Sequence, residues 1–409
     1  MEFQKVAYDA ESSRQSKDKV RKRLQDANIS LPQLLKAKMI RRMKTLTWGN
    51  GKVSQLRKID SSYVELPMLN AIPAHLVDRF DPAFVQQHNK YQLGRLHTHQ
   101  IPIEWVRANP AKYAISYGRA HFPTTRVKIS EQKCPVKDGE ITIRIFEPVD
   151  GKPKKPAYMN FHGGGWVFGG GLAKDHEFCK RLVHNLGCVA FDVDYRLAPE
   201  YPHPTQLEDC WDAFRWMRAK ADEFGLDLEK LAVGGASAGG HLAAVVAFRC
   251  RDGGVPLAFQ LLQVPVTDLV AAFTPTAELD PTCPYESYRE MWDVVVLPGE
   301  RMSYFQKAWL GNPRPAKYDH DWEVSPIKNP DLSNLAPALI VTAEMDPLRD
   351  EGEAYGRKMN EAGSKADIWR IPGVPHTVVH LDGILEGAQQ FNAKAIKALS
   401  EAWDVPITP

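Results

Sequence analysis

Short apolar runs alternate with longer stretches of helical periodicity over the last two thirds of this 409-residue chain. The apolar runs have the length and composition of strands, and they occupy residues 139–147, 156–161, 187–194, 230–235, 258–264, 337–343 and 366–371. The predicted helices lie between or after them, at 172–186, 204–222, 238–251, 350–362 and 381–401. Alternating strands and helices predict an α/β fold, with a mostly parallel sheet and helices on both of its faces.

Small residues around Ser237 mark the sharpest break in this pattern. The predicted strand that ends near residue 235 runs into Gly235-Ala236-Ser237-Ala238-Gly239, and a predicted helix begins there. A serine on a tight strand-to-helix turn has a strained backbone, and only small residues two positions away let strand and helix approach each other. The pattern indicates a nucleophile elbow centred on Ser237. Turns of small residues also serve packing alone, and that alternative stays open at this point.

Three successive glycines follow another predicted strand, in His162-Gly163-Gly164-Gly165-Trp166. Backbone without side chains can turn its N–H groups toward one point, which stabilisation of an oxyanion during acyl transfer requires. Loops of this type supply such donors in lipases and esterases. A merely flexible glycine loop is the alternative, and the flanking histidine and tryptophan favour the oxyanion role.

A serine nucleophile needs a base, and the base needs an acid that orients it. Asp346 follows the predicted strand 337–343, and His376 follows the predicted strand 366–371. Both residues therefore lie at carboxyl ends of strands, where catalytic groups of open α/β sheets collect. The chain order Ser237, Asp346, His376 is the order expected of an α/β-hydrolase triad.

Three neighbouring residues are alternatives for these roles. Glu344 points to the same side of the strand end as Asp346, so it stays open as the orienting acid. His380 stays open as the base, although we expect it on the first turn of the following helix. Asp350 is more simply a carboxylate near a helix N-terminus.

Five motifs together resemble those of the hormone-sensitive-lipase family of α/β-hydrolases, whose relatives include arylacetamide deacetylases and plant carboxylesterase-like proteins. The motifs are His162-Gly163-Gly164-Gly165, Asp194-Tyr195-Arg196-Leu197-Ala198-Pro199-Glu200, Gly235-Ala236-Ser237-Ala238-Gly239-Gly240, Pro265-Val266-Thr267-Asp268 and Asp346-Pro347-Leu348-Arg349-Asp350-Glu351-Gly352. The resemblance covers about residues 138–400. It does not extend to the first hundred or so residues.

The resemblance implies a catalytic triad of Ser237, Asp346 and His376. It also implies an oxyanion hole formed by the backbone N–H groups of Gly163, Gly164 and Ala238. Two positions depart from the usual pattern, namely Ala236 before the serine and Thr377-Val378 after the histidine. Neither departure removes a catalytic atom, so both bear on substrate preference.

The alternation of strands and helices stops between about residues 269 and 325, where Pro, Trp and Tyr are frequent. Insertions at this point commonly supply cap elements in the family, so we expect a helical cap here. Large side chains could line an apolar pocket, namely Trp166 from the glycine loop and Tyr285, Tyr288, Met291, Trp292, Tyr304, Phe305 and Trp309. A helix pair that packs its own aromatics is an equal alternative.

Residues 1–60 carry 15 Lys or Arg against 6 Asp or Glu, although the whole chain has a formal net charge of only +2. Leucines and methionines recur at near-helical spacing between Leu31 and Leu46, which predicts a basic amphipathic helix. Such a helix could lie on an anionic membrane, but we favour a cap helix over the active site. We therefore divide the chain into an N-terminal cap and linking region, 1–122, and a catalytic domain, 123–409.

Composition adds several exclusions. The small net charge gives no reason to expect nucleic acid as a partner, and no apolar run approaches the roughly 18 residues of a membrane span. The six cysteines lack Cys-x-x-Cys spacing, which favours neither zinc nor a disulfide framework, and no metal or organic cofactor is implied. Because Met1–Lys5 lacks the organisation of a signal peptide, we expect a cytoplasmic protein, with a homodimer left open.

These features predict a serine esterase that cleaves carboxylic esters of small to medium apolar substrates. Lactone or amide hydrolysis on the same residues is an alternative, as is an elimination reaction related to those of some plant relatives. Outside enzymes, the alternative is a small-molecule receptor, because some plant members of this fold family are receptors that have lost the catalytic histidine. The presence of His376 disfavours the receptor.

Overall fold

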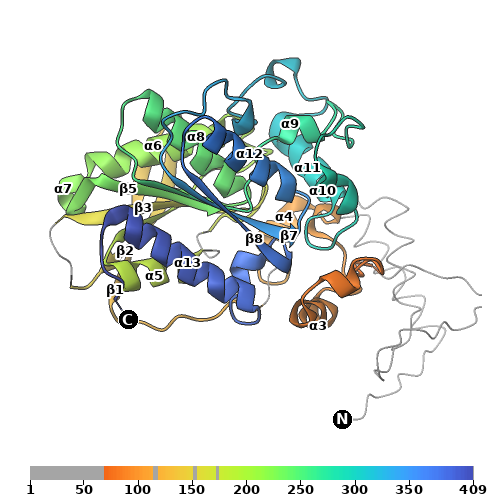
Figure 1. The fold of residues 1–409 in the computed structure, drawn as a ribbon, viewed down its shortest axis with the longest axis horizontal. Coiled ribbons are helices and arrows are strands. Elements are labelled where there is room, and N and C mark those ends of the chain that lie inside the picture. Colours follow the sequence, from red (N-terminus) through yellow and green to blue (C-terminus); the bar gives the residue numbers. More distant parts are fainter. Residues whose placement is uncertain (1–68, 114–117, 151–153, 172–174, 409) are drawn as a thin grey trace, which may run out of the picture. The chain divides into compact units, whose positions relative to one another are not determined.

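The computed structural model describes residues 69–113, 118–150, 154–171 and 175–408. These residues belong to two compact units, which are treated separately. The first unit comprises Met1–Ala71 and Asn89–Ala114, and the second comprises Ile72–His88 and Ile115–Pro409. The second unit contains an eight-stranded sheet with flanking helices, shown in Figure 1.

The sheet has the strand order β1-β2-β4-β3-β5-β6-β7-β8. The strands are β1 (Val127–Val136), β2 (Gly139–Pro148), β3 (Lys155–Phe161), β4 (Val189–Asp194), β5 (Leu226–Ala236), β6 (Phe259–Gln263), β7 (Ala338–Met345) and β8 (Ala366–Pro375). The pairs β1–β2 and β2–β4 are antiparallel, and all pairs from β4 to β8 are parallel. The predicted α/β fold with a mostly parallel sheet is confirmed.

The edge strand β1 is the element that the hydrophobic pattern did not reveal. Its side chains are exposed or half-buried, and only Cys134 is buried. An edge strand that is solvated along its length shows no apolar run, so its sequence lacks the signal that marked the other strands. The seven predicted strands are all present, with ends that differ by a few residues.

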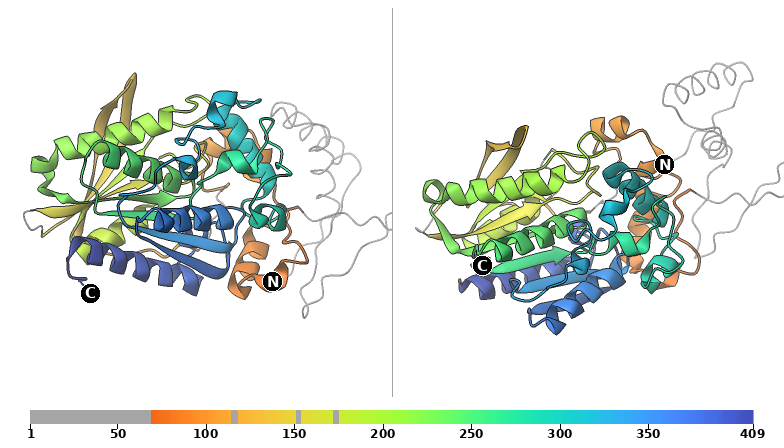
Figure 2. Two further views of the ribbon diagram at one scale, coloured as in Figure 1. Left: turned by 45° about the horizontal axis from the view of Figure 1, so that its top comes forward. Right: turned by 90° about the horizontal axis from the view of Figure 1, so that it is seen from above.

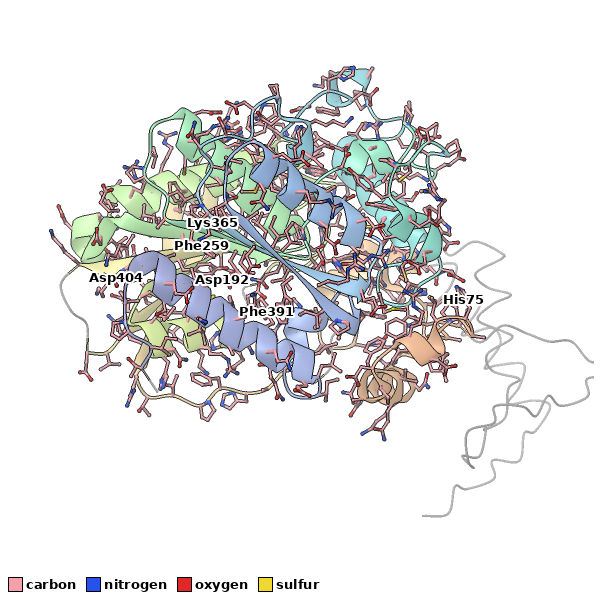
Figure 3. The ribbon with its side chains drawn as sticks, in the orientation of Figure 1. His75, Asp192, Phe259, Lys365, Phe391 and Asp404 are labelled. Carbon is pink, nitrogen blue, oxygen red and sulfur yellow. The ribbon has the colours of Figure 1, made fainter. Side chains whose placement is uncertain are left out.

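Helices cover both faces of the sheet (Figures 1 and 2). One face carries α5 (His176–Leu186) and α13 (Glu386–Trp403), and Phe391 of α13, labelled in Figure 3, is fully buried. The other face carries α6 (Thr205–Ala219), α8 (Ala238–Asp252) and α12 (Arg349–Glu361). The predicted helix 204–222 ends earlier, because the chain turns at Lys220 and continues as the short α7 (Ala221–Phe224).

The segment between β6 and β7 holds short helices and long connections. They are α9 (Leu269–Ala272), α10 (Glu286–Glu290), α11 (Gly299–Leu310) and the 3-10 turns η3 (Ala316–Tyr318) and η4 (Pro326–Lys328). Among these elements α11 has the greatest length, and it carries the fully buried Trp309. The region predicted as a cap insertion, about 269–325, therefore packs aromatic side chains into the second unit.

Residues 72–88 belong to the unit that contains the sheet, although sequence analysis grouped them with the N-terminal region. The 3-10 turn η1 (Val77–Arg79) precedes α3 (Pro82–Tyr91). Leu76, Phe80 and Phe84 are buried in the same apolar core as residues of β8 and α13. The Asp81 N–H also donates a hydrogen bond of 2.7 Å to the carbonyl of Gly373.

The described part of the first unit contains η2 (Thr98–Gln100) and α4 (Ile103–Ala108). Within this unit the Gly94 N–H donates to the carbonyl of Leu69 over 2.8 Å. The basic helix predicted between Leu31 and Leu46 lies outside the described residues, so its cap role stays a prediction.

The described ranges contain neither a membrane-spanning helix nor a cluster of metal-binding side chains. Within them, no helix is both long enough and apolar enough to cross a membrane. In the same ranges, no group of three or more His, Cys, Asp or Glu side chains is placed to hold a metal ion. The six cysteines are buried free thiols, at positions 134, 179, 188, 210, 250 and 283.

Candidate active site

Ser237 occupies the turn between β5 and α8, in an unusual backbone conformation. Its φ is 59° and its ψ is −119°, a region that costs a residue other than glycine about 1–3 kcal/mol. The turn is held by its neighbours, because the Ser237 N–H donates to the carbonyl of Gln263 over 2.8 Å and the Ser237 carbonyl accepts from His241 over 3.1 Å. The conformation of a nucleophile elbow is therefore present.

The two glycines that flank Ser237 are required by close backbone contacts. A Cβ atom on Gly235 would lie 2.1 Å from the carbonyl oxygen of Phe161, and one on Gly239 would lie 1.8 Å from the same oxygen. Real Cβ atoms essentially never come this close to another atom. The close approach of α8 to β3 therefore explains why the positions two residues before and after Ser237 must be small.

Asp346 and His376 are in direct contact. Asp346 directly follows β7 and His376 directly follows β8. The Nδ1 atom of His376 lies 2.7 Å from Oδ2 of Asp346, and the other carboxylate oxygen accepts the Leu348 N–H over 3.1 Å. Asp346 is fully buried and His376 is 7% exposed. A buried carboxylate at this distance fixes the ring orientation of the histidine and favours a proton on Nδ1.

Sheet topology explains why distant residues meet at one edge. The chain passes from β3 outward to β4 and later returns to β5 on the other side of β3. In open α/β sheets, ligands bind outside the carboxyl ends of strands where the strand order reverses in this way. The glycine loop follows β3 and Ser237 follows β5, so both lie at this reversal, and Asp346 and His376 follow parallel strands further along the same edge.

The alternative acid and base have other partners. Glu344 accepts the Gly373 N–H over 2.8 Å and lies 3.4 Å from the guanidinium of Arg79. His380 lies in the 3-10 turn η5 (Val378–His380), ahead of the final helix on which we expected it. Its Nε2 is 2.9 Å from Asp175 Oδ1. The carboxylate on His376 is therefore that of Asp346.

Asp350 also has a structural role. Its Oδ2 accepts the Ser287 N–H of α10 over 2.7 Å, and its Oδ1 accepts from Arg349 over 2.7 Å. These contacts connect the first turn of α12 with the segment between β6 and β7, as a helix N-terminal carboxylate can do.

The glycine loop has a backbone that only small residues tolerate. Gly164 has φ 130° and Gly165 has φ 61°, and a Cβ on Gly164 would lie 2.0 Å from the carbonyl oxygen of Phe168. A Cβ on Gly163 would lie 3.4 Å from Cβ of Ser237. The loop therefore runs beside the serine.

Ala238 supplies a further backbone donor at this place. It is the first residue of α8, and the first N–H groups of a helix have no intrahelical acceptor. The positive end of the helix dipole favours negative charge at the same point.

Five of the aromatics predicted to line a pocket fall into two groups, namely Trp166 and Tyr288 in one and Trp292, Tyr304 and Phe305 in the other. Trp166 and Tyr288 are fully buried; Trp166 stacks on Trp309, and the Tyr288 hydroxyl donates to Glu351 over 2.8 Å. We therefore leave these two out of the proposed pocket lining, because packing and hydrogen bonding explain them.

Of the other three aromatics, Phe305 and Trp292 lie close to glycines. A Cβ on Gly165 would be 2.3 Å from the Phe305 ring, and a Cβ on Gly299 would be 2.2 Å from the Trp292 ring. Tyr304 is half-buried and stacks near Phe168, with ring centroids 6.2 Å apart. Phe305 and Tyr304 thus lie beside the glycine loop.

Sequence analysis missed a buried polar network that contacts His380. The amide of Asn160 donates to Asp175 over 3.0 Å and to Asp192 over 2.8 Å, and Asp175 also contacts His380. Burial, together with the charge of Asp175, raises the pKa of Asp192 to about 8. Burial alone would raise the pKa of Asp175 too, but the hydrogen bond and charge of His380, with Arg119 nearby, hold that pKa below its usual range.

Glu351 is a further buried acid that sequence analysis gave no role. It accepts the Thr267 N–H over 2.6 Å and the Asp268 N–H over 3.2 Å, and burial raises its pKa to about 8. The sequence did contain a signal for this contact. Glu351 lies in the motif Asp346–Gly352, and Thr267-Asp268 lies in another of the five motifs. The contact shows that the two motifs meet in space.

Comparisons with known proteins identify the family of this chain. A family model for the alpha/beta hydrolase fold matches residues 158–380. An AB hydrolase superfamily protein of Schizosaccharomyces pombe is 33% identical over 343 residues, covering 80% of this chain and 95% of that protein. The carboxylesterase NlhH of Mycobacterium tuberculosis is 36% identical over 279 residues, covering 66% of this chain and 82% of the relative.

Among solved structures, a hyperthermophilic esterase from Pyrobaculum calidifontis is 32% identical and superposes with a TM-score of 0.68, covering 79% of this chain and 98% of that one. The family model spans more than half of the present chain and includes the glycine loop, Ser237 and Asp346-His376. The family expected from the five motifs is confirmed, and the chain belongs to the hormone-sensitive-lipase-like family of α/β-hydrolases.

Proposed function

We propose that the protein hydrolyses carboxylic esters by a two-step acyl-enzyme mechanism, with Ser237 as nucleophile, His376 as base and Asp346 as orienting acid. The observation that carries the proposal is the buried contact of 2.7 Å between Asp346 and His376, at the sheet edge where Ser237 has the conformation of a nucleophile elbow. Relatives named carboxylesterase and esterase support the reaction class.

In the first step, the Ser237 oxygen attacks the ester carbonyl carbon while Nε2 of His376 takes the hydroxyl proton. The tetrahedral intermediate then collapses, so that the bond to the alcohol oxygen breaks and that oxygen receives the proton from His376. In the second step, water attacks the acyl-enzyme, again giving its proton to His376, and the acid leaves as Ser237 recovers its hydrogen. Asp346 stabilises the imidazolium that forms in each step.

The oxyanion in both tetrahedral intermediates needs donors that are already in place. We assign the N–H groups of Gly163, Gly164 and Ala238 to it, because the loop runs beside Ser237 and Ala238 begins α8. Donors fixed in this way are worth roughly 3–4 kcal/mol each in the transition state. Phe305 and Tyr304 beside the loop, with Trp292 in the same segment, suit a small to medium apolar substrate.

The test is hydrolysis of p-nitrophenyl esters from acetate to laurate, with Ser237→Ala as the control. Alanine fits the same turn but provides no nucleophile, so the variant should remain folded and lose roughly 10⁶-fold in turnover. A folded Ser237→Ala protein with near wild-type turnover would remove the serine mechanism. Lactones and anilides in the same panel test the alternative substrates.

A further inference from the structure

Trp166 of the glycine loop stacks face to face on Trp309 of α11. The ring centroids are 3.9 Å apart and the planes differ by 6°, and both side chains are fully buried. Trp309 is itself fixed, because its indole Nε1 donates to Gln206 over 2.9 Å and its carbonyl accepts the His203 N–H over 3.0 Å. The stack joins the glycine loop to a helix of the segment between β6 and β7.

His241 connects the same pair of rings to the nucleophile. Its ring meets Trp166 edge to face at 5.2 Å and Trp309 at 5.3 Å. It lies in the first turn of α8, where its N–H donates to the carbonyl of Ser237. Burial lowers the pKa of His241 to about 3, so the ring stays neutral and the cluster has a constant charge across the working pH range.

The backbone of the loop needs such support. Trp166 has φ 60°, a left-handed conformation that a bulky residue adopts only when its surroundings hold it there. The Trp166 carbonyl accepts the Ala198 N–H over 2.9 Å. Two residues of α11 contact the loop, since the Phe305 ring lies against Gly165 and the Trp309 ring lies against Trp166. Without the stack, the strained turn loses a face-to-face ring contact that holds it.

We propose that Trp309 is a positioning residue for ester hydrolysis: its stack on Trp166 fixes the glycine loop so that the N–H groups of Gly163 and Gly164 point at the oxyanion. The inference rests on the proposed function. It assigns to α11 a role in transition-state stabilisation, although Trp309 itself touches no reacting atom. A loop that is free to relax would still admit the substrate but would stabilise the oxyanion poorly, so the effect should appear in kcat and not in KM.

The test compares Trp309→Leu, Trp309→Phe and Trp403→Leu in the full-length protein. Trp403 is the matched control, because it is also fully buried but lies at the end of α13 on the opposite face of the sheet from α8. Trp309→Leu should lower kcat about tenfold or more with KM within about twofold of wild type, since loss of a full donor costs about 10²–10³. Trp309→Phe keeps a stacking ring and should recover most of kcat.

A second readout isolates the oxyanion. A trifluoromethyl ketone forms a hemiketal with the serine, and its oxyanion occupies the same hole, so its inhibition constant should rise with the fall in kcat of Trp309→Leu. Trp403→Leu should lower Tm comparably and leave both values unchanged. If Trp309→Leu does not fold, Trp309→Met is measured against Trp309→Phe in the same way.

Three results overturn the inference: unchanged kcat in Trp309→Leu with lowered Tm, a change confined to KM, or an equal loss of kcat in Trp403→Leu. Wild-type protein in the same assay tests the proposed function separately. If wild type hydrolyses no ester, the esterase proposal and this inference both fall, whereas an active wild type with an unaffected Trp309→Leu variant overturns only the inference.

Discussion

Individual residues at this site hold backbone conformations that most side chains avoid. Ser237 has φ 59°, and the loop beside it has Gly164 at φ 130° and Trp166 at φ 60°. Such conformations persist only where neighbours determine them. For Ser237 the neighbours are the carbonyl of Gln263 and the close packing of Gly235 against β3. Substitutions at these positions should therefore act on chemistry through backbone geometry.

Gly164→Val tests this expectation for the glycine loop, to which we assign the oxyanion donors. Valine is strained at φ 130°, and its Cβ would lie 2.0 Å from the carbonyl oxygen of Phe168, so the loop must shift and its N–H groups lose their aim. Turnover on p-nitrophenyl butyrate should fall about a hundredfold or more, with circular dichroism showing a folded protein.

Gly187→Val is the matched control for that variant. Gly187 ends α5 with φ 62°, and nothing lies within 4 Å of an added Cβ. The substitution should cost stability through the same kind of backbone strain and leave kcat unchanged. A folded Gly164→Val enzyme with the kcat of Gly187→Val would show that the glycines serve the loop alone.

Substitutions of His376 and His380 should have clearly different effects on kcat. His376→Ala removes the proposed base and should lower kcat roughly 10⁶-fold. His380→Ala leaves the carboxylate of Asp175 buried without its imidazole partner, which costs about 3 kcal/mol, but it should keep kcat within about tenfold of wild type. Stopped assays and thermal melts of both variants check this pair. The opposite ranking of the two kcat values would move the base to His380.

Sequence reasoning reached Asp346 and His376 because each follows an apolar strand, and the sheet brings such positions together. The network of Asn160, Asp175 and Asp192 gave no comparable signal. Its members come from β3, β4 and the residue before α5, and each is an ordinary polar residue in the linear sequence. Only the register of β3 on β4, which pairs Asn160 with Asp192, brings them into contact.

At the scale of elements, the network of Asn160, Asp175 and Asp192 joins β3, β4 and the start of α5, and it contacts His380 in η5. Asn160 lies on β3, Asp192 on β4 (labelled in Figure 3), and Asp175 precedes α5. Two buried carboxylates that share one amide cannot both be ionised without cost. The proton therefore stays on Asp192 to unusually high pH, while the contact with His380 keeps Asp175 ionised.

Asp192→Asn tests the shared proton through the pH dependence of stability. The folded pKa of Asp192, about 8, lies above its ordinary value of 3.8. The stabilising contribution is therefore complete below the ordinary value and is lost as pH rises through about 8. Wild-type Tm should fall relative to the variant by a few degrees between pH 6 and pH 9.

The groups that act on Asp192 in this test are Asp175, Arg144 of β2 and Asp194 of β4. Asparagine imitates the protonated carboxyl, so the variant should lose this part of the pH dependence and no other. Glu351 also has a pKa near 8 and titrates in both proteins, which is why the difference between the two curves is measured. If the curves of Tm against pH are parallel for wild type and Asp192→Asn, Asp192 does not titrate in this range.

The elements that sequence reasoning found and missed differ in burial. β3 and β4 are buried on both faces of the sheet and read as apolar runs. β1 is solvated, and its pairing with β2 depends on a two-residue turn with Asp138 at φ 60°. Neither feature produces a hydrophobic run in the sequence. The short helices between β6 and β7 were expected as a cap, but which of their aromatics face the core depends on contacts such as Tyr288 with Glu351.

At the scale of the whole molecule, the unit that contains the sheet begins at Ile72 and is interrupted by Asn89–Ala114, which belong to the other unit. Leu76, Phe80 and Phe84 complete the core beside β8 and α13, and Arg79 makes ion pairs with Glu290 and Glu344. A chain that begins after residue 88 lacks all of these contacts and should not accumulate as a folded protein. A chain that begins at residue 47 keeps them, so it isolates the role of the basic N-terminal segment.

Deletion of residues 1–46 distinguishes a cap from a membrane anchor. If the segment covers the site, as we propose, its removal uncovers apolar surface, and the shortened protein should lose activity or solubility. The intact protein should then not bind anionic vesicles. A membrane anchor predicts salt-sensitive co-sedimentation of the intact protein with such vesicles, because surface charge is screened within about 10 Å at 0.1 M salt. Co-sedimentation that disappears on deletion, with undiminished hydrolysis of short esters, would contradict the cap.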